Sequence, residues 1–382
     1  MPGGPSRPAP LQPPQSPTPR RKKGGRDLYL DLLRALALIR VVVYHTFNWA
    51  WLTLAFPAMG VMFALAGSLM ARSLDRRDRT ATAVVRARMR RLLPPLWLFA
   101  VFVVGAMFVH GWTPEDDGGE GRWAELLFWV VPLNDPPAAD SGWSQQIVAP
   151  LWYIRAYLVF VLLSPLLLRA YRRMPWPCVT VFLALAALAQ TGLVRLPVRG
   201  EGPVTDLVTF GACWLLGFAH RDGLVDRLPA ARVWTLALLV MTAGGWFGLT
   251  HPTEEGYDLN EIPFAQALWS FGFVLLLLRF RPHGDRWVRR LRPVHAGVVL
   301  LNARAVTVYL WHEVALVLGV LLIDRMWAVP ALERSLPLDA GWFLFLLVWP
   351  LIGAAVLLVG WAEDVAAGRR PRLWPRREPE AA

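Results

Sequence analysis

The chain has 382 residues, of which 55% are hydrophobic and 18% are charged, with 20 tryptophans and a formal net charge of +12. This balance is typical of a polytopic membrane protein and excludes an ordinary soluble enzyme. Because the arginines cluster in short segments between apolar runs, the positive charge does not indicate nucleic-acid binding. Cys178 and Cys213 lie in apolar segments, so neither a disulfide framework nor a zinc spacing is indicated.

Residues 1–25 are rich in proline and end in a basic run, which is typical of a disordered cytosolic tail. The chain then contains ten apolar segments long enough to span about 30 Å of hydrocarbon as α-helices. These predicted spans are residues 28–50, 53–71, 92–111, 147–168, 176–194, 204–220, 232–250, 263–280, 297–322 and 341–361. A further apolar stretch, 123–133, is too short to cross and is expected to be re-entrant or interfacial. The predicted fold is therefore all-α, with a transmembrane core over 26–365 and a basic cytosolic tail over 366–382.

The distribution of positive charge predicts the orientation of these spans. If the N-terminal tail is cytosolic and each segment crosses once, 31 of the 40 Lys and Arg residues lie in inner segments. Five Lys and Arg residues lie in outer loops, and the remaining four lie within spans. Two of the outer loops are rich in acidic residues instead. Since positively charged loops stay on the cytosolic side, this asymmetry favours ten crossings of a cell (inner) membrane with both termini cytosolic.

Asp31, Arg34 and His45 form a polar stripe on the first predicted span. Arg34 and His45 are about three helical turns apart, so both lie on one face, roughly 16 Å apart along the axis. Charge at a membrane helix centre costs roughly 2.5–3.5 kcal/mol on insertion scales, so it persists mainly where pairing or function requires it. His45 is the leading candidate for a general base, because an imidazole titrates near working pH. The structural alternatives are a packing histidine and an Asp31–Arg34 pair that only neutralises itself.

Four arginines, Arg86, Arg88, Arg90 and Arg91, precede the third predicted span. Such a cluster is usually a topology determinant or a patch that binds lipid headgroups. Guanidinium groups also suit phosphates, so a polyphosphate cofactor arriving from the cytosol would find a site here.

Tyr309, His312 and Glu313 lie within the ninth predicted span. A second histidine with a tyrosine and a carboxylate at mid-membrane indicates more than packing. Arg155 is another intramembrane cation, and Asp206 is a candidate counter-ion that the sequence does not pair with it. The sequence contains no nucleophile elbow, phosphate-binding loop or paired-histidine zinc helix. The chemistry therefore falls to intramembrane His, Arg, Asp and Tyr, and no metal is expected.

These motifs, in their order along the chain, resemble the acyltransferase-3 family of membrane-bound O-acyltransferases. Arg34 and His45 resemble its Arg-x10-His signature, preceded by the usual aspartate, here Asp31. Four further stretches resemble its Phe-Phe-x-x-Ser-Gly-Phe-Leu, Arg-x-x-Arg, Leu-Trp-aromatic and Tyr-Leu-x-His motifs, namely residues 60–69, 88–94, 151–153 and 309–312. The likeness extends over about residues 26–365. The chain departs from the pattern at Ala66, where the family often has serine.

The resemblance implies a core that takes an acyl group from cytosolic acyl-CoA and delivers it to a hydroxyl, commonly on a sugar. His45 would be the catalytic base and Arg34, beside Asp31, its essential partner. His312 would line the same cavity. In the mechanism that we infer from these residues, Tyr309, His312 or an arginine stabilises the oxyanion. The arginines expected to contact CoA are Arg86, Arg88 and Arg91.

Two other interpretations remain open from the sequence. A multi-span transporter or flippase would use the same His/Arg/Asp stripe as a relay. A catalytically inactive structural member of the family is the second. The expected partners are acyl-CoA, the lipid bilayer and a carbohydrate, glycoconjugate or glycosylated metabolite as acceptor, with no nucleic acid.

Overall fold

The computed structural model describes residues 28–114, 122–192, 198–254, 256–282 and 292–373. These residues are helical or in connecting loops, with no β-strand among them, which confirms the predicted all-α class. The predicted tail over 1–25 lies outside the described residues, as do positions 374–382 of the predicted C-terminal tail.

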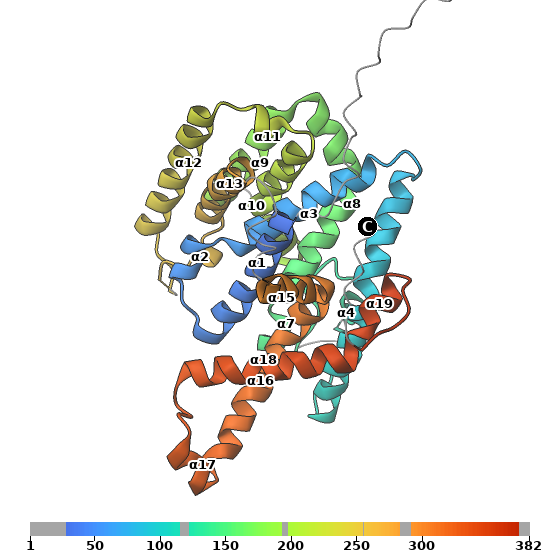
Figure 1. The fold of residues 1–382 in the computed structure, drawn as a ribbon, viewed down its shortest axis with the longest axis vertical. Coiled ribbons are helices and arrows are strands. Elements are labelled where there is room, and N and C mark those ends of the chain that lie inside the picture. Colours follow the sequence, from blue (N-terminus) through green and yellow to red (C-terminus); the bar gives the residue numbers. More distant parts are fainter. Residues whose placement is uncertain (1–27, 115–121, 193–197, 255, 283–291, 374–382) are drawn as a thin grey trace, which may run out of the picture.

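Figure 1 colours the helices from blue at the N-terminal end to red at the C-terminal end of the chain. They are α1 (Leu28–Phe47), α2 (Trp51–Ala55), α3 (Ala58–Leu74), α4 (Ala81–Val109), α5 (Arg122–Glu125), α6 (Leu127–Val130), α7 (Gly142–Val148), α8 (Leu151–Arg173), α9 (Pro175–Gln190), α10 (Val198–Arg221), α11 (Leu224–Arg227), α12 (Ala230–Thr250), η1 (Leu259–Glu261), α13 (Pro263–Arg279), α15 (Arg292–Ala303), α16 (Ala305–Trp327), α17 (Pro330–Ser335), α18 (Gly341–Val359) and α19 (Trp361–Ala366).

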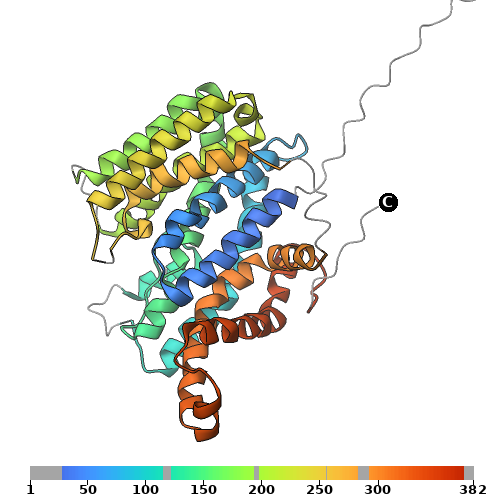
Figure 2. The ribbon, with the colours of Figure 1, turned by 60° about the vertical axis from the view of Figure 1, so that its left-hand side comes forward.

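The long helices pack in layers, which Figure 2 shows from the side. Helices α9, α12 and α13 form one outer layer, and α10 packs between this layer and α3. Helix α1 lies between α3 and α16, and α18 covers α16. The first and the ninth predicted spans are therefore neighbours, although they lie near opposite ends of the chain.

Two glycines let α3 and α10 approach each other closely. A Cβ added at Gly217 would collide with the carbonyl oxygen of Ala64, and one at Gly67 with that of Trp214. Small residues at such a crossing allow backbone-to-backbone contact, which is how membrane helices commonly pack. The seam fixes α3, and α3 in turn supports the inner face of α1.

Seven segments of the described chain are helical, long and apolar enough to cross a membrane, so the protein is a multi-pass membrane protein. They are Trp51–Leu74, Ala81–Val109, Gly142–Arg173, Glu201–Arg221, Ala230–Thr250, Ala305–Trp327 and Gly341–Val359. The other three predicted spans correspond to α1, α9 and α13. Helices α9 and α13 have only 16 and 17 residues, and α1 carries three charged residues within its 20.

The structure corrects the boundaries of two predicted spans. The predicted span 297–322 is divided, because α15 ends at Ala303 and α16 begins at Ala305, with Arg304 at non-helical dihedrals between them. This break lets the buried Arg304 guanidinium reach Asp364 Oδ2 at 2.6 Å. The first span ends at Phe47 instead of residue 50, because Asn48 adopts a positive φ of 49°, as helix-terminating residues often do.

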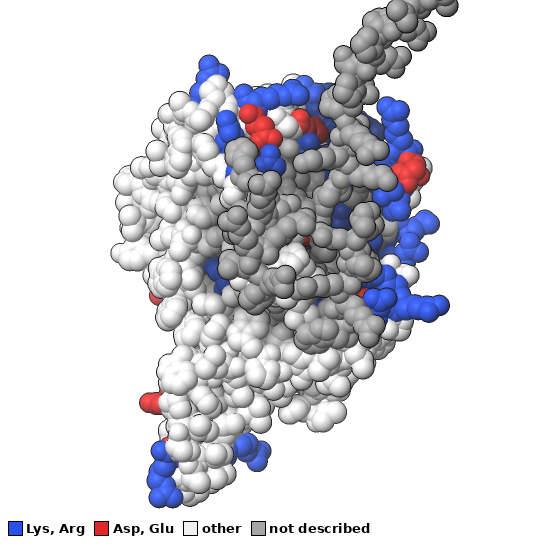
Figure 3. Space-filling view, viewed as in Figure 1, with Lys and Arg blue, Asp and Glu red and all other residues white. Residues whose placement is uncertain are grey.

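Charged side chains gather at one end of the molecule. Figure 3 shows arginines along the top and right-hand side of the view, around the start of α4, with a smaller group at α17 at the opposite end. Helix α4 begins at Ala81. The arginine run 86–91 is therefore part of a continuous helix and not a loop before it.

Candidate active site

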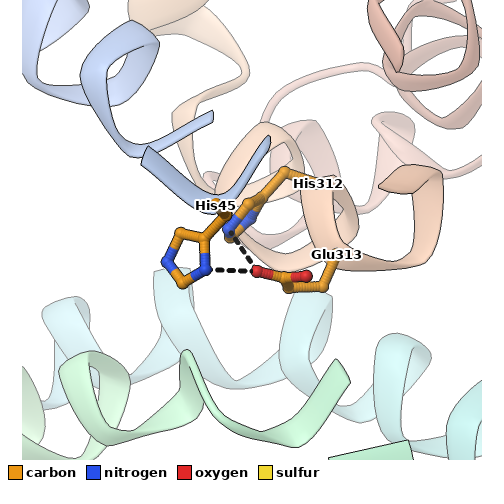
Figure 4. Close-up of side chains that lie close together, drawn as sticks. All are labelled: His45, His312 and Glu313. Atoms are coloured by element: carbon orange, nitrogen blue, oxygen red, sulfur yellow. Dashed lines mark ion pairs between the residues drawn. The ribbon is translucent and has the colours of Figure 1, made fainter. Parts of the chain in front are cut away.

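His45 and Glu313 form the centre of the candidate site, shown in Figure 4. His45 lies in the last turn of α1 and Glu313 on α16, and the Nδ1 atom of His45 is 2.6 Å from Oε1 of Glu313. The Glu313 side chain is 1% exposed, whereas that of His45 is 30% exposed. A buried carboxylate thus contacts one edge of the imidazole, at Nδ1, while part of the His45 side chain remains exposed.

Gln146 completes the surroundings of the Glu313 carboxylate. Its side-chain amide, on the short helix α7, donates a hydrogen bond of 2.9 Å to Oε2 of Glu313. A buried carboxylate needs such partners, because an unpaired buried charge is costly. Glu313 is therefore fixed by α7 at one oxygen and faces His45 with the other.

His312 lies against the same pair from the neighbouring position on α16. Its ring centre is 5.0 Å from that of His45, and its Nε2 atom is 3.5 Å from Glu313 Oε1. Its Nδ1 atom lies 2.5 Å from the carbonyl oxygen of Tyr309. Since a carbonyl only accepts, Nδ1 carries the hydrogen and Nε2 is the atom that faces the site.

Tyr309 lies one turn before His312 on α16. Its hydroxyl donates to the carbonyl oxygen of Pro150 at 2.7 Å, at the start of α8. A phenol has a single hydrogen to donate, so in this arrangement the hydroxyl holds α16 to α8. The centre of its ring lies 5.0 Å from that of Tyr153, with the two rings tilted by 52°, and this packing also joins α16 to α8.

A second polar cluster lies beside His45 on α1. The Tyr44 hydroxyl donates to Asp258 Oδ2 at 2.5 Å, and the Arg40 guanidinium lies 4.7 Å from the centre of the Tyr44 ring. Arg40 and Asp258 are both buried. This cluster attaches the loop containing η1 to α1, and the Tyr44 ring lies edge-on to that of His45, with 5.3 Å between the ring centres.

Arg34 and Asp31 lie near the other end of α1 and not in contact with His45. Arg34 Nη1 is 3.4 Å from Asp31 Oδ1 and 3.1 Å from Asn302 Oδ1, and the Asn302 amide donates to the Asp31 carbonyl at 2.7 Å. The predicted i,i+3 pair is thus confirmed, with Asn302 of α15 as its third member. From helix geometry, Arg34 remains about 16 Å from His45 along the axis.

The predicted CoA-contacting arginines separate onto different surfaces of α4. Arg88 donates to the Leu69 carbonyl at 3.1 Å and to Ser73 Oγ at 2.9 Å, so it attaches α4 to α3. Arg91 is exposed, and the like charges of Arg88 and Arg369 act on it. Arg86 is also exposed but lines a groove on the side of α4 that faces α8.

Ser68 and His220 are in contact, but the histidine is not arranged as a general base that would activate the serine as a nucleophile. Ser68 Oγ is 3.0 Å from His220 Nδ1, and Arg281 Nη1 is 2.9 Å from His220 Nε2. Because a guanidinium only donates, Nε2 accepts and Nδ1 carries the hydrogen. His220 therefore donates to Ser68 and cannot remove its proton.

The ligand atoms of His45, His312 and Glu313 all lie within 4.8 Å of one another. By geometry alone, this trio is the group within the described residues that could hold a metal ion. The 2.6 Å contact between His45 and Glu313 is itself an ion pair when the imidazole is protonated.

Two residues of this site had no assigned role in the sequence. Glu313 is an intramembrane carboxylate next to His312, which is itself a signal for function. Gln146 carries no charge and lies on a helix of only 7 residues, so no pattern in the sequence indicated it. The catalytic roles expected for Asp31, Arg34, His45, Tyr309 and His312 stay predictions.

The fold and the site define a multi-pass membrane protein with a His–Glu pair suited to proton transfer between its helices. A family model described as an acyltransferase domain, that of the acyltransferase-3 family, matches residues 27–362, and the chain belongs to this family. Neither a curated protein nor a solved structure matches the chain significantly. Family membership supports an acyltransferase and does not favour the transporter interpretation.

Proposed function

We propose that this protein is an acyl-CoA-dependent O-acyltransferase of the inner membrane. It moves an acyl group, acetyl or short-chain, from cytosolic acyl-CoA to a hydroxyl of a carbohydrate or related acceptor. The observation that carries the proposal is the 2.6 Å contact between His45 Nδ1 and Glu313 Oε1. With its hydrogen held on Nδ1 by the carboxylate, the imidazole keeps Nε2 free to accept a proton.

The reaction then follows from general-base chemistry. His45 Nε2 removes the proton of the acceptor hydroxyl as its oxygen attacks the thioester carbonyl. A tetrahedral oxyanion forms, and its collapse breaks the carbon–sulfur bond. The departing CoA thiolate takes the proton back from His45, so the products are the ester and CoA. Glu313 stabilises the transient imidazolium and maintains its orientation, as the acid of a catalytic triad does.

His312 is the group best placed to act on the developing oxyanion. Its ring lies beside that of His45, and its Nε2 faces the site from a fully buried position. Nδ1 already donates to Tyr309, so Nε2 donates only in the protonated ring. Full burial and the neighbouring His45 disfavour that form, and the Glu313 carboxylate, 3.5 Å from Nε2, is the charged group that opposes them.

The donor would bind at the end of the bundle where α4 begins. Arg91 is exposed there, with Arg88 and Arg369 contributing like charge to its surroundings. Such a concentration of positive charge suits the phosphates of CoA. The thioester must then reach His45, about 16 Å further along α1 than Arg34, through the helices around the polar stripe.

The acceptor would bind at the opposite end, where His45 is exposed. Phe47, Trp49 and Trp51 follow His45, and their rings stack in series at 4.3 Å and 5.7 Å between centres. Trp49 and Trp51 are 44% and 56% exposed. An exposed indole offers a broad apolar face with a polar edge, which suits the face of a sugar ring.

The proposed topology has ten crossings with both termini in the cytosol. Under it, α1, α9 and α13 cross as short or charged helices shielded by their neighbours. A reporter fused at each terminus and cysteine labelling at exposed Trp51 and Trp342 test this arrangement. Labelling of either position from the cytosolic side would contradict it.

The function is tested with the purified protein in lipid nanodiscs. Acetyl-CoA is supplied with a panel of glycans, and both free CoA thiol and the acylated glycan are measured. Wild-type protein should release CoA with matching acceptor acylation, while His45→Gln should do neither. His251→Gln, a change at an exposed histidine, is the matched control and should behave as wild type. Undiminished turnover by His45→Gln would refute the base assignment.

A further inference from the structure

The arginine run of α4 faces two different directions. Arg86 and Arg90 are four residues apart, and Arg88 and Arg91 three apart, so each pair shares a helix face. Two residues along a helix turn by about 200°, so the first pair points almost opposite to Arg88. Only the Arg88 and Arg91 side enters the proposed donor site. Arg86, which the sequence also predicts to contact CoA, lies with Arg90 on the other side of α4 from Arg88.

Arg86 and Arg90 border an apolar groove between α4 and α8. The groove has a volume of about 670 Å³. Its lining residues, apart from these two arginines, are Ala81, Thr82, Val85, Met89, Leu93, Pro94, Trp97, Leu162 and Pro165. A second cavity of about 390 Å³ shares Ala81 and Pro165 with it and is bordered by Arg169, Arg172 and Arg173. The groove is thus apolar along its length and basic at one end.

The groove is about as long as one bilayer leaflet with its headgroup region. From Ala81 to Trp97, α4 rises about 24 Å, and one leaflet is about 20–22 Å thick, of which about 15 Å is hydrocarbon. Helix α4 has 29 residues, or about 43 Å, so its first turns extend beyond the hydrocarbon into the headgroup region. Arg86 and Arg90 therefore lie at headgroup level when Leu93 and Trp97 lie among acyl chains.

The charge at the basic end is available to a ligand. Within the described part of the chain, neither Arg86 nor Arg90 forms a hydrogen bond or an ion pair. Arg172, by contrast, is held by Asp222 at 3.0 Å and 2.8 Å and by Asp75 at 2.7 Å. Two free guanidinium groups one turn apart can bind the oxygens of one phosphate between them.

We propose that this groove is a binding site for one anionic phospholipid of the leaflet in which α4 begins. Its phosphate lies between Arg86 and Arg90, and one acyl chain follows Leu93 and Pro94 toward Trp97. A bilayer supplies such molecules permanently, and the anionic headgroup matches the charge that α4 presents. The lipid also fills the space between α4 and α8, and so supports the face of α4 opposite the proposed donor site.

The test is native mass spectrometry of the intact protein released from nanodiscs of mixed phosphatidylcholine and phosphatidylglycerol. The wild type should retain one phosphatidylglycerol. Arg86→Gln/Arg90→Gln should lose it, and so should Leu162→Trp, which fills the groove without changing charge. The matched control is Arg227→Gln/Arg232→Gln, which removes the same charge from another basic segment and should keep the lipid.

Three outcomes would overturn the proposal. One is equal retention of phosphatidylcholine, since the site would then not select charge. Another is unchanged retention of phosphatidylglycerol in both groove variants. The third is displacement of the lipid by palmitoyl-CoA, which would assign the groove to a long-chain donor. None of these results depends on acyl transfer, so failure here is distinguishable from failure of the proposed function.

Discussion

The Nδ1 atom of His45 lies 2.6 Å from the Oε1 atom of Glu313, and the two residues come from helices at opposite ends of the sequence. The contact determines which ring nitrogen remains for chemistry. In the proposed mechanism the accessible imidazole transfers the proton, and the buried carboxylate orients the imidazole and stabilises its charged form. The first prediction follows from this division.

Glu313→Gln should lower turnover by about 10²–10⁴-fold, the usual contribution of a positioned acid–base group. The amide keeps the shape of the side chain and can still accept from Gln146, but it cannot stabilise an imidazolium. CoA release in nanodiscs measures the loss, and the melting temperature shows whether the fold is kept. Turnover within threefold of wild type would contradict the role of Glu313.

Arg88→Gln and Arg91→Gln should have separable effects. Arg88 donates two hydrogen bonds to α3, so its loss should lower the free energy of unfolding by about 1.5–3 kcal/mol. Arg91 is exposed, so its loss should leave stability unchanged and raise the KM for acyl-CoA about tenfold, equivalent to one charge-assisted contact. Thermal unfolding and steady-state kinetics of both variants decide this. A normal KM in Arg91→Gln would remove it from the donor site.

Arg155 and Asp206 should act as one unit in stability. Arg155 Nη2 is 2.6 Å from Asp206 Oδ2, and the Arg155 side chain is 4% exposed. Asp206→Asn should cost about 3–5 kcal/mol, because it leaves a buried guanidinium with only the exposed Asp135 as a counter-ion. Arg155→Met/Asp206→Leu should recover much of this loss. Additive losses in chemical unfolding of the single and double variants would show that the pair is not coupled.

Glu363 should make stability fall as pH rises. Burial raises its pKa above the ordinary 4.5, although hydrogen bonds from the Thr307 amide and hydroxyl oppose the shift. The folded protein therefore holds a proton that the unfolded chain releases, so folding is favoured below pH 4.5 and loses this contribution as pH rises through the raised pKa. Glu363→Gln should remove that decline.

The measurement is the melting temperature between pH 4 and neutrality, with the exposed Glu333→Gln as the charge-matched control. The control should retain the decline of the wild type. Identical pH profiles for wild type and Glu363→Gln would contradict the assignment. The glutamine oxygen can still accept from Thr307, so the comparison isolates the charge.

Chelation should leave activity intact. The trio of His45, His312 and Glu313 has a spacing that a metal could use, but the proposed base needs only the proton between His45 and Glu313. Prolonged dialysis against EDTA should therefore not change CoA release. If EDTA abolishes activity and added zinc restores it, the trio is a metal site and the assignment of His45 as a metal-free base is wrong.

Much of the fold could be predicted from the sequence, because apolar length and charge asymmetry are properties of each segment alone. The polar stripe on α1 could be predicted for the same reason, since helix periodicity aligns residues within one helix. The division of residues 297–322 could not, because the buried Arg304 breaks the helix to reach Asp364, a residue far along the chain.

The pairing of groups from different helices was also beyond the sequence. Asp206 was a candidate partner for Arg155, but only the packing of α8 against α10 brings the two together. The sequence assigned His45 and His312 to two different predicted spans, and their contact depends on α1 lying against α16. Gln146 had no signal at all, because a neutral amide on a short helix carries no pattern.

The packing of α1 against α16 links catalysis to biosynthesis. A ribosome releases α1 long before α16, so the first helix must wait in the bilayer with its charged stripe and His45 lacking their final neighbours. The His45–Glu313 pair forms only when nearly the whole chain has been inserted. Under the proposed function, a truncated or incompletely inserted product therefore lacks its general base and transfers no acyl group.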